Sequence, residues 1–242
     1  MGTTVVTTII GNGLLAKRFA AVEFKRDCLV LASGVSNSNE QRPAEFQREV
    51  DIVEAAIRAH ASSRVIYFST CSVLQTTQTP YVRHKLAMES LVAALASSFC
   101  IYRLPQVVGP TRNQTLVSYF VEAVLLRRRV TVQRWARRNL VDVDDVVRLI
   151  SHLIQHDIGT NSTQALAAAH GVSVAQVLKA IGGILDLEPL CDVIDAGDAY
   201  DIPTDFLERH FGASDPLMQF DYWRTALQRH VPALASTLRC SV

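Results

Sequence analysis

Ile9-Ile10-Gly11-Asn12-Gly13-Leu14-Leu15-Ala16 joins a β-branched stretch, Val5–Ile10, to an apolar stretch with helical spacing, Leu14–Val22. The pattern is a strand that runs into G-x-G-x-x-A and then a helix. In such a turn the first glycine allows the sharp bend, the second lets the backbone approach a pyrophosphate, and the small last residue keeps helix and strand close. The helix start offers free N–H groups to the anion. The stretch therefore predicts a phosphate-binding βα unit, with a plain βα turn as the alternative.

Beyond this first turn, short apolar segments alternate along the chain with amphipathic segments. Strands are predicted over Cys28–Ala32, Val65–Phe68 and Phe99–Leu104, and helices over Ala44–Ala61, Tyr81–Ser97, Leu116–Leu126 and Asp142–Gln155. This alternation favours an α/β fold, a Rossmann-like parallel sheet with helices on both faces. Turn residues become frequent after Ile158. We therefore predict a dinucleotide-binding domain over residues 1–158 and a small C-terminal lobe over residues 159–242, to which the family resemblance described below assigns the substrate side.

One part of the dinucleotide pattern is absent. An acidic residue normally follows the glycines by about 20 residues, at the end of the second strand, and holds the adenosine ribose. Here the next strand ends in Ala32-Ser33-Gly34, and Asp27 precedes that strand. Only one helix fits between Ala16 and Cys28, so we expect a sheet that is shortened in its second-strand region. The nearby cations are candidates for a ribose phosphate, or are solvated surface charges: Arg18, Lys25 and Arg26.

Composition excludes several classes of protein. The 242 residues are 49% hydrophobic and 19% charged, which excludes wholesale disorder. Lys plus Arg number 24 against 23 Asp plus Glu, and so balanced a chain is a poor non-specific nucleic-acid binder despite Arg127-Arg128-Arg129. No apolar run reaches membrane-span length, and the N-terminus lacks a signal-peptide pattern. The five scattered cysteines argue against a disulfide framework and a structural zinc site, and at least four of them are predicted to be buried thiols in a reducing cytoplasm.

Tyr81-Val82-Arg83-His84-Lys85 places a phenol and an ammonium four residues apart, on one face of a predicted helix. A neighbouring ammonium stabilises a phenolate and lowers the tyrosine pKa. Such a tyrosine can exchange a proton with a carbinol or a carbonyl. Upstream, Thr70 follows a strand end, where parallel sheets bind ligands. A plain surface helix and a simple capping hydroxyl are the alternatives.

Together these motifs resemble the extended short-chain dehydrogenase/reductases, in particular the NAD-dependent epimerase/dehydratase family. The resemblance runs from about Thr4 to Ile150 and also includes Phe68-Ser69-Thr70, Arg103–Pro110 and Arg138–Val146. It implies a Rossmann-like domain that binds NAD or NADP and a smaller domain that binds a nucleotide-sugar. It also implies a homodimer formed through the helices Ala44–Ala61 and Tyr81–Ser97.

By position, the resemblance implies catalytic roles for Thr70, Tyr81 and Lys85, with Tyr81 as the acid/base and Lys85 holding the nicotinamide ribose. The residues that it places against the cofactor are Gly11, Asn12, Gly13, Leu14, Leu15, Ala32, Ser33, Gly34, Ser69, Tyr81, Lys85, Leu104, Pro105 and Val107. The residues that it places against the substrate are Ser36, Asn37, Thr70, Gln106, Arg112, Asn113 and Arg138, so part of the stretch 106–140 would contribute to the substrate cleft.

Two differences from the family pattern narrow the range of reactions that the resemblance implies. Cys71-Ser72 stands where sugar dehydratases of the family carry Asp-Glu, which disfavours a 4,6-dehydratase. Cys71 lies one residue from the position of a proton-removing cysteine in some epimerase-reductases and is a candidate for that role. The leading interpretation is a cytoplasmic NAD(P)-dependent 4-keto reductase or epimerase of surface-polysaccharide biosynthesis. The alternative is a non-catalytic relative that binds a nucleotide or a partner, which the shortened second-strand region favours and the intact Tyr-Lys pair opposes.

Overall fold

The computed structural model describes residues 5–111 and 113–239, and the chain divides into two compact units. Unit 1 comprises residues 1–104 and 144–166, and unit 2 comprises residues 105–143 and 167–242. This division differs from the predicted boundary at residues 158 and 159. The reason is that the chain leaves unit 1 after its fourth strand, builds part of unit 2, and then returns to add a last helix and strand to the first sheet.

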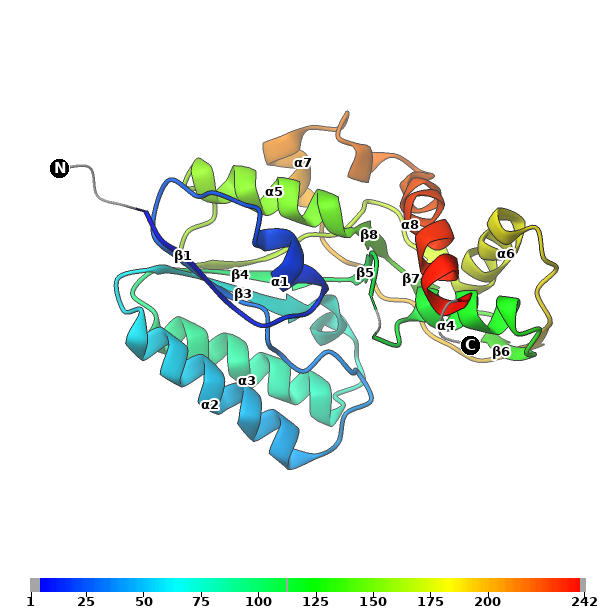
Figure 1. The fold of residues 1–242 in the computed structure, drawn as a ribbon, viewed down its shortest axis with the longest axis horizontal. Coiled ribbons are helices and arrows are strands. Elements are labelled where there is room, and N and C mark those ends of the chain that lie inside the picture. The colour runs from blue at the N-terminus through cyan, green and yellow to red at the C-terminus, as the bar shows by residue number, and fades with distance from the viewer. Residues whose placement is uncertain (1–4, 112, 240–242) are drawn as a thin grey trace. The chain divides into compact units, whose positions relative to one another are not determined.

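Unit 1 contains a parallel sheet of five strands in the order β1-β2-β3-β4-β9 (Figure 1). The strands are β1 (Thr7–Ile10), β2 (Cys28–Leu31), β3 (Arg64–Thr70), β4 (Phe99–Leu104) and β9 (Ser162–Ala165). Every neighbouring pair is parallel. The predicted α/β fold class with its parallel sheet is thereby confirmed.

Helices cover both faces of this sheet. They are α1 (Leu14–Phe19), α2 (Pro43–Ala59), α3 (Pro80–Leu95) and α5 (Val143–Gln155), and the 3₁₀ turn η1 spans Cys71–Leu74. Figure 1 shows α1 and α5 on one face and α2 and α3 on the other. Side chains agree, because the Phe68 ring lies 5.5 Å from that of Phe19 in α1, whereas the adjacent Tyr67 packs with Val53 of α2 and Met88 of α3. Neighbouring residues of a strand point to opposite faces.

β1 lies at the edge of the sheet, and among the described residues it pairs with β2 alone. Strand order therefore follows chain order from β1 to β9, without the reversal that marks a doubly wound dinucleotide fold. Because α1 and α2 lie on opposite faces, the crossovers from β1 to β2 and from β2 to β3 have opposite hands. One of the two thus departs from the right-handed rule. The sheet is shortened in the region that the sequence indicated.

Unit 2 has its own core, in which α4 (Leu116–Leu125), α6 (Val174–Leu185) and α8 (Tyr222–Arg239) pack together. Its buried residues include Phe120 of α4, Ile181 of α6 and Leu227 of α8. The other elements are the parallel pairs β5 (Gln106–Val108) with β8 (Leu140–Asp142) and β6 (Val130–Gln133) with β11 (Cys191–Ile194), the antiparallel pair β7 (Arg137–Arg138) with β10 (Val172–Ser173), helix α7 (Asp205–Phe211) and the turn η2 (Pro216–Met218).

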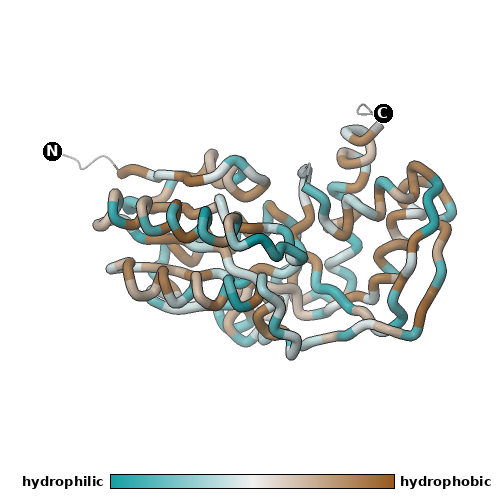
Figure 2. The backbone as a smooth tube through the Cα atoms, turned by 90° about the horizontal axis from the view of Figure 1, so that it is seen from below, coloured by the Kyte–Doolittle hydropathy of each residue, from teal (hydrophilic) through white to brown (hydrophobic). Residues whose placement is uncertain are grey.

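Figure 2 shows hydrophobic and hydrophilic residues alternating along the helices of both units, as amphipathic helices require. Within the described ranges, no helix is both long enough and apolar enough to span a membrane.

Candidate functional site

The carboxyl ends of successive parallel strands bring several predicted site residues together along the carboxyl-end edge of the unit 1 sheet, which is distinct from the side edge of β1 that no described strand pairs with. β1 ends at Ile10, β2 at Leu31, β3 at Thr70 and β4 at Leu104. The first two ends touch, since the N–H of Ala32 donates to the carbonyl oxygen of Ile10 at 2.8 Å. Open α/β sheets bind their ligands at this edge.

The two glycines of the first turn occupy different environments. Gly11 has a φ of +130°, and a Cβ atom there would lie 2.4 Å from the carbonyl oxygen of Ala32. The fold therefore requires glycine at position 11. Gly13 is the N-cap of α1 with a φ of −76°, no side chain caps the helix, and a Cβ atom there would meet nothing within 4 Å. The space in front of the helix start is open, as an approaching diphosphate needs.

Ser33 supplies a second sign of a ligand at this edge. Its Oγ atom is buried, yet it has no hydrogen-bond partner among the described residues. A buried hydroxyl without a partner costs free energy unless something satisfies it. The open turn from Gly11 to Leu15 and the Ser33 hydroxyl together fit the diphosphate and a ribose of a nicotinamide cofactor.

Thr70, the predicted catalytic hydroxyl residue, ends β3 at this edge. Its Oγ1 accepts the N–H of Ser72 at 3.1 Å and so caps η1. Ser69 points away from Thr70, toward α3, and its hydroxyl donates to Oε1 of Glu89 at 2.5 Å. Arg103 binds the same carboxylate, with Nη2 at 2.6 Å from Oε2. The Ser69 hydroxyl is thus used inside the protein, and only the backbone of Ser69 is left to face a cofactor.

Cys71 does not suit the role of proton acceptor. The side chain is buried, and its Sγ donates to the carbonyl oxygen of Arg103 at 3.3 Å. Burial raises the pKa of the Cys71 thiol to about 12, against the lowering effect of the Arg103 charge. At neutral pH the group remains a thiol and cannot remove a sugar proton.

The Tyr-Lys pair lies on α3 as the spacing predicts, but both residues are buried. Thr79 caps the helix by accepting the N–H of Val82 at 3.2 Å, and Pro80 occupies the first turn. Tyr81 packs in an apolar cluster with Val35 and Val73. Lys85 is 3% exposed, and this alone separates it from the surface lysine of a plain helix.

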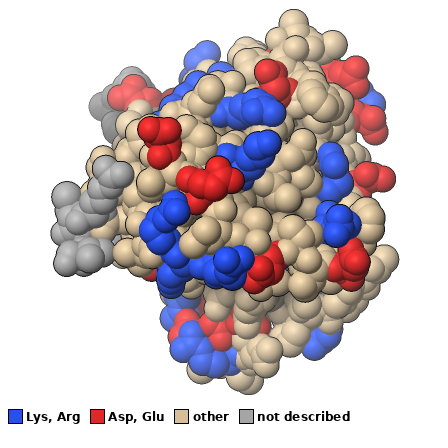
Figure 3. Space-filling view, turned by 90° about the vertical axis from the view of Figure 1, so that its right-hand side faces the viewer, with Lys and Arg blue, Asp and Glu red and all other residues tan. Residues whose placement is uncertain are grey.

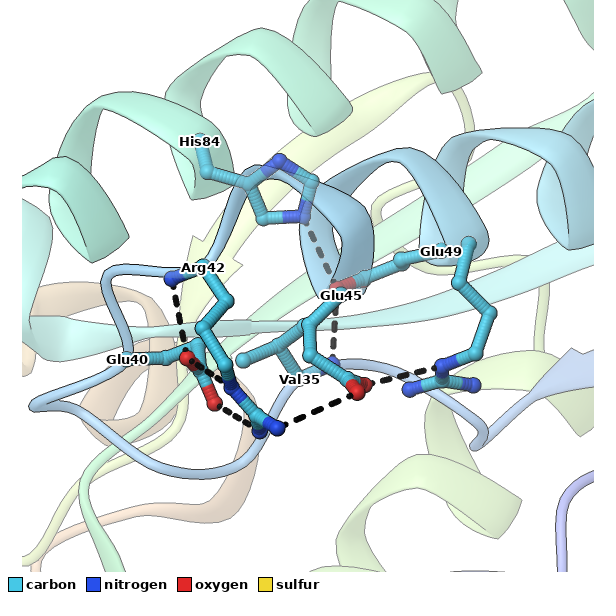
Figure 4. Close-up of polar contacts among 7 residues, drawn as sticks. Val35, Glu40, Arg42, Glu45, Glu49 and His84 are labelled. Atoms are coloured by element: carbon cyan, nitrogen blue, oxygen red, sulfur yellow. Dashed lines mark hydrogen bonds and ion pairs between the residues drawn. The ribbon is translucent and has the colours of Figure 1, made fainter.

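The Lys85 ammonium is held by a carboxylate that the sequence analysis did not identify. Lys85 Nζ lies 2.8 Å from Oε1 of Glu49 and 3.1 Å from the hydroxyl of Tyr67. Glu49 is fully buried and accepts a further hydrogen bond from Tyr67 at 2.7 Å. Its Oε2 accepts the N–H of Val35 at 2.7 Å and pairs with Nε2 of His84 at 2.9 Å (Figure 4).

Electrostatics keep Glu49 ionised. Burial alone would raise the pKa of this carboxyl, but the hydrogen bond from His84 and the charge of Lys85 outweigh burial and hold the pKa well below its usual range. For Tyr67, burial and the neighbouring Glu49 charge raise the pKa far above that of a free tyrosine. The cluster is therefore a buried ion pair with a neutral phenol beside it.

Gly34 lies directly over this ion pair. A Cβ atom at Gly34 would lie 2.7 Å from Glu49 Oε1 and 2.8 Å from Lys85 Nζ. The sequence carried a signal for Glu49, because its position lies on the same helical stripe as the apolar residues Val53 and Ala56. A carboxylate on a buried stripe needs a partner, and Lys85 supplies it.

Two of the predicted substrate residues of unit 2, Asn113 and Arg138, line separate hollows. Arg138 lines a cavity of about 220 Å³ together with Asn139, His170 and Tyr200. Asn113 lines another, of about 480 Å³, with polar side chains of α4 and the loop before it and with α8 residues. Arg112 lies outside the described residues. Gln106 belongs to β5, where its N–H donates to the carbonyl oxygen of Asn139 at 3.1 Å.

The remaining predicted residues divide between the units. Ser36 and Asn37 are exposed after β2, and Asn37 Oδ1 accepts the N–H of Asn39 at 3.0 Å in a local turn. Leu104 is buried at the end of β4. Asn12 is exposed in the glycine turn, and Leu14 and Leu15 begin the helix that follows it. Pro105 and Val107 follow β4 and belong to unit 2.

Two of the three arginines in the stretch Arg127–Arg129 of unit 2 pair with nearby acids. Arg128 pairs with Glu122 at 2.9 Å and Arg129 with Asp192 at 3.0 Å. Figure 3 shows positive and negative side chains interspersed on the face that it presents. This arrangement lacks the continuous basic surface that nucleic-acid binding uses.

Comparisons with known proteins identify the family and the fold. The model of the NAD dependent epimerase/dehydratase family matches residues 16–165. No curated protein matches the sequence. Among solved structures, RMD from Pseudomonas aeruginosa complexed with NADPH is similar at 15% identity, with a TM-score of 0.75 over 99% of this chain and 100% of that one.

Two other solved structures are also similar. WbmH from Bordetella bronchiseptica in complex with NAD⁺ shares 18% identity, with a TM-score of 0.68 over 85% of this chain and 74% of that one. The UDP-glucose 4-epimerase of Thermus thermophilus, in complex with NAD, shares 14% identity, with a TM-score of 0.65 over 94% of this chain and 82% of that one. At these identities the structures establish the fold, and the family match establishes the relationship. The chain belongs to the NAD-dependent epimerase/dehydratase family.

Proposed function

We propose that this protein is an NAD(P)-dependent enzyme that reduces or epimerises a nucleotide-sugar, as a 4-keto reductase or an epimerase. The observation that carries the proposal is the edge formed by the strand ends, where the open Gly11–Gly13 turn, the unpartnered Ser33 hydroxyl and Thr70 come together. Structural neighbours include several enzymes described as UDP-sugar 4-epimerases, which supports a nucleotide-sugar substrate. A role in surface-polysaccharide biosynthesis, a cytoplasmic location and a homodimer belong to the same proposal.

The chain's own residues divide the work of the reaction. The backbone from Gly11 to Leu15 would hold the cofactor's diphosphate, and the Ser33 hydroxyl would bind a ribose. The bound nicotinamide supplies or accepts a hydride. The Tyr81 hydroxyl would give or take the proton at the reacting sugar oxygen, and Thr70 would hold that oxygen. Glu49 holds the Lys85 ammonium at 2.8 Å and also accepts the N–H of Val35, so in this structure Lys85 pairs with the carboxylate that fixes the turn after Gly34.

Turnover tests the proposed role of Tyr81. We expect Tyr81→Phe to lower kcat by roughly 10²–10⁴, the usual effect of losing a general acid–base group. Tyr119→Phe, on α4 of unit 2, is the matched control and should retain wild-type turnover. Assays would follow NADH and NADPH absorbance with nucleotide-linked 4-keto sugars, and product analysis would detect epimers. Wild-type kcat in Tyr81→Phe would contradict this mechanism.

Substrate class is tested separately by thermal shift. UDP-, GDP-, CDP- and dTDP-sugars are screened, and one nucleotide should raise the Tm. Arg138→Met should reduce that rise, because charge-assisted hydrogen bonds to the diphosphate are lost. Arg209→Met, which changes an exposed arginine of α7, is the control and should leave the nucleotide-induced rise in Tm unchanged. Absence of any nucleotide effect would overturn the nucleotide-sugar proposal.

A second candidate is a relative that binds a nucleotide without turnover. The specific observation in its favour is the burial of Lys85 against Glu49, because an ammonium already paired at 2.8 Å is less available to a cofactor ribose. This candidate predicts nucleotide binding together with no turnover on any nucleotide-sugar. It also predicts that Tyr81→Phe leaves nucleotide affinity unchanged.

A further inference from the structure

The outer edge of β1 is the least usual feature of unit 1. The carbonyl oxygens of Val6 and Ile10 accept hydrogen bonds from β2-side N–H groups, at 3.0 Å from Cys28 and 2.8 Å from Ala32. Residues alternate in direction along a strand, so Thr7 and Ile9 direct their backbone polar groups away from β2. No described strand pairs with that edge.

The segment between α1 and β2 explains why no described strand pairs with the outer edge of β1. Phe24 is buried, and its ring lies 6.4 Å from that of Phe19 in α1. The chain thus turns back onto α1 and enters β2 directly, without a strand between. Asp27 is used at the amino end of β2, where its Oδ1 accepts the N–H of Val6 at 2.8 Å. It therefore lies at the opposite end of the strand from the candidate site.

A dinucleotide normally spans two mononucleotide-binding halves of the sheet, one on each side of the first strand. The second strand of such a sheet supplies the group that holds the adenosine ribose. Here every other strand of the sheet lies on one side of β1. Of the three cations that could meet an adenosine ribose phosphate, the two arginines are also paired, Arg18 with Asp144 at 3.3 Å and Arg26 with Asp157 at 2.6 Å.

We propose that the cofactor site of this chain is a half-site, which recognises the nicotinamide riboside and phosphate and makes no specific contact with the adenosine. The proposal rests on the proposed function, since it concerns the same site. It follows that no described strand on the open side of β1 would recognise the 2′-phosphate, which distinguishes NADP from NAD. The protein then has no means of choosing between the two dinucleotides, and nicotinamide mononucleotide carries nearly all of the recognised chemistry.

Isothermal titration calorimetry of the intact protein with NADH, NADPH and reduced nicotinamide mononucleotide tests the half-site proposal. We expect the Kd values of NADH and NADPH to agree within about threefold and that of the mononucleotide to lie within about tenfold of NADH, since tenfold corresponds to about 1.4 kcal/mol. Adenosine 2′,5′-bisphosphate should not displace NADH. A mononucleotide more than about 100-fold weaker than NADH, or a preference above about tenfold for one dinucleotide, would overturn the half-site.

A pair of glycine variants assigns the binding to the turn. Gly13→Val should weaken NADH and the mononucleotide equally, because the added side chain occupies the open space that the phosphate enters. Gly183→Val, at another glycine where a Cβ atom meets nothing within 4 Å, should weaken neither. If neither dinucleotide nor the mononucleotide binds at millimolar concentration, the proposed function fails together with the half-site. If NADH binds and depends strongly on its adenosine, the half-site alone fails.

Discussion

At the scale of single residues, Gly11 and Gly13 have separable roles that a substitution can distinguish. Gly11→Ala should lower the free energy of unfolding by roughly 1–3 kcal/mol, because alanine is strained at a φ of +130° and its Cβ would lie 2.4 Å from the carbonyl oxygen of Ala32. Gly13→Ser should leave it unchanged or raise it by a few tenths of a kcal/mol, because serine is a good N-cap and has space. Urea denaturation at pH 7 measures both. Equal losses in the two variants would contradict the assignment.

Lys85 and Glu49 are coupled, and the coupling decides how Lys85 variants are interpreted. Lys85→Met leaves the Glu49 carboxylate buried without its cation and should lower the free energy of unfolding by roughly 3–5 kcal/mol. The double variant Glu49→Gln/Lys85→Met should recover most of this loss. Lys179→Met, at an exposed lysine of α6, serves as the control for loss of a lysine. A Lys85→Met protein as stable as wild type would show that the ion pair contributes nothing.

The proposed catalytic residues Thr70, Tyr81 and Lys85 show how far sequence reasoning reached at this scale. The spacing of Tyr81 and Lys85 predicted one helix with both residues on one face, and α3 has this form. The ion pair with Glu49 was not predictable from that spacing, because the carboxylate comes from α2, 36 residues earlier. Only the sheet order, which places α2 beside α3, brings the two residues together.

At the scale of elements, the open edge of β1 gives an alternating pattern of amide exchange. Thr8 and Ile10 direct their N–H groups toward β2, whereas those of Thr7 and Ile9 face the unpaired edge. In hydrogen exchange followed by NMR, Thr7 and Ile9 should exchange fast and Thr8 and Ile10 slowly. Slow exchange at all four would mean that another strand, such as one from a second copy of the chain, covers this edge.

Strong patterns predicted the elements of unit 1, whereas unit 2 shows where such patterns end. The apolar run Cys28–Leu31 and the stripe on α2 are long enough to indicate their type. The strands of unit 2 are two to four residues long and none is an uninterrupted apolar run of four residues. β11 pairs with β6, Cys191 beside Val130, although several helices and strands lie between them along the chain. Only tertiary structure makes them strands.

At the scale of the whole molecule, the path of the chain matters more than any one boundary. Each unit is built from two separate segments, because residues 144–166 return to unit 1 with α5 and β9. β9 pairs with β4, so the first sheet is complete only after the chain has passed through residues 105–143. A single cut at the predicted boundary of 158 and 159 would thus remove β9 from its sheet.

Ionisable groups with shifted pKa values predict that stability is level at intermediate pH and declines toward both acid and alkaline pH. On the acid side, hydrogen bonds from Arg42 lower the pKa of Glu40 to about 2, and Glu49 and Asp157 also have lowered pKa values because of His84, Lys85 and Arg64. These carboxyls bind protons more weakly in the folded than in the unfolded chain. Their contribution is therefore complete above the ordinary carboxyl range and is lost as the pH falls below about 4.5.

On the alkaline side, burial raises the pKa of Cys28 and of Cys71 to about 12 from the ordinary 9.0. A raised pKa means that unfolding favours ionisation, so stability is complete below pH 9 and falls as the pH rises toward the folded-state values. Urea midpoints measured from pH 3.5 to 10.5 should thus be level between about pH 5 and 9 and decline on both sides. Glu49→Gln should flatten the acid limb and Cys71→Ala the alkaline one. A midpoint at pH 3.5 equal to that at pH 7 would contradict the assigned carboxylates.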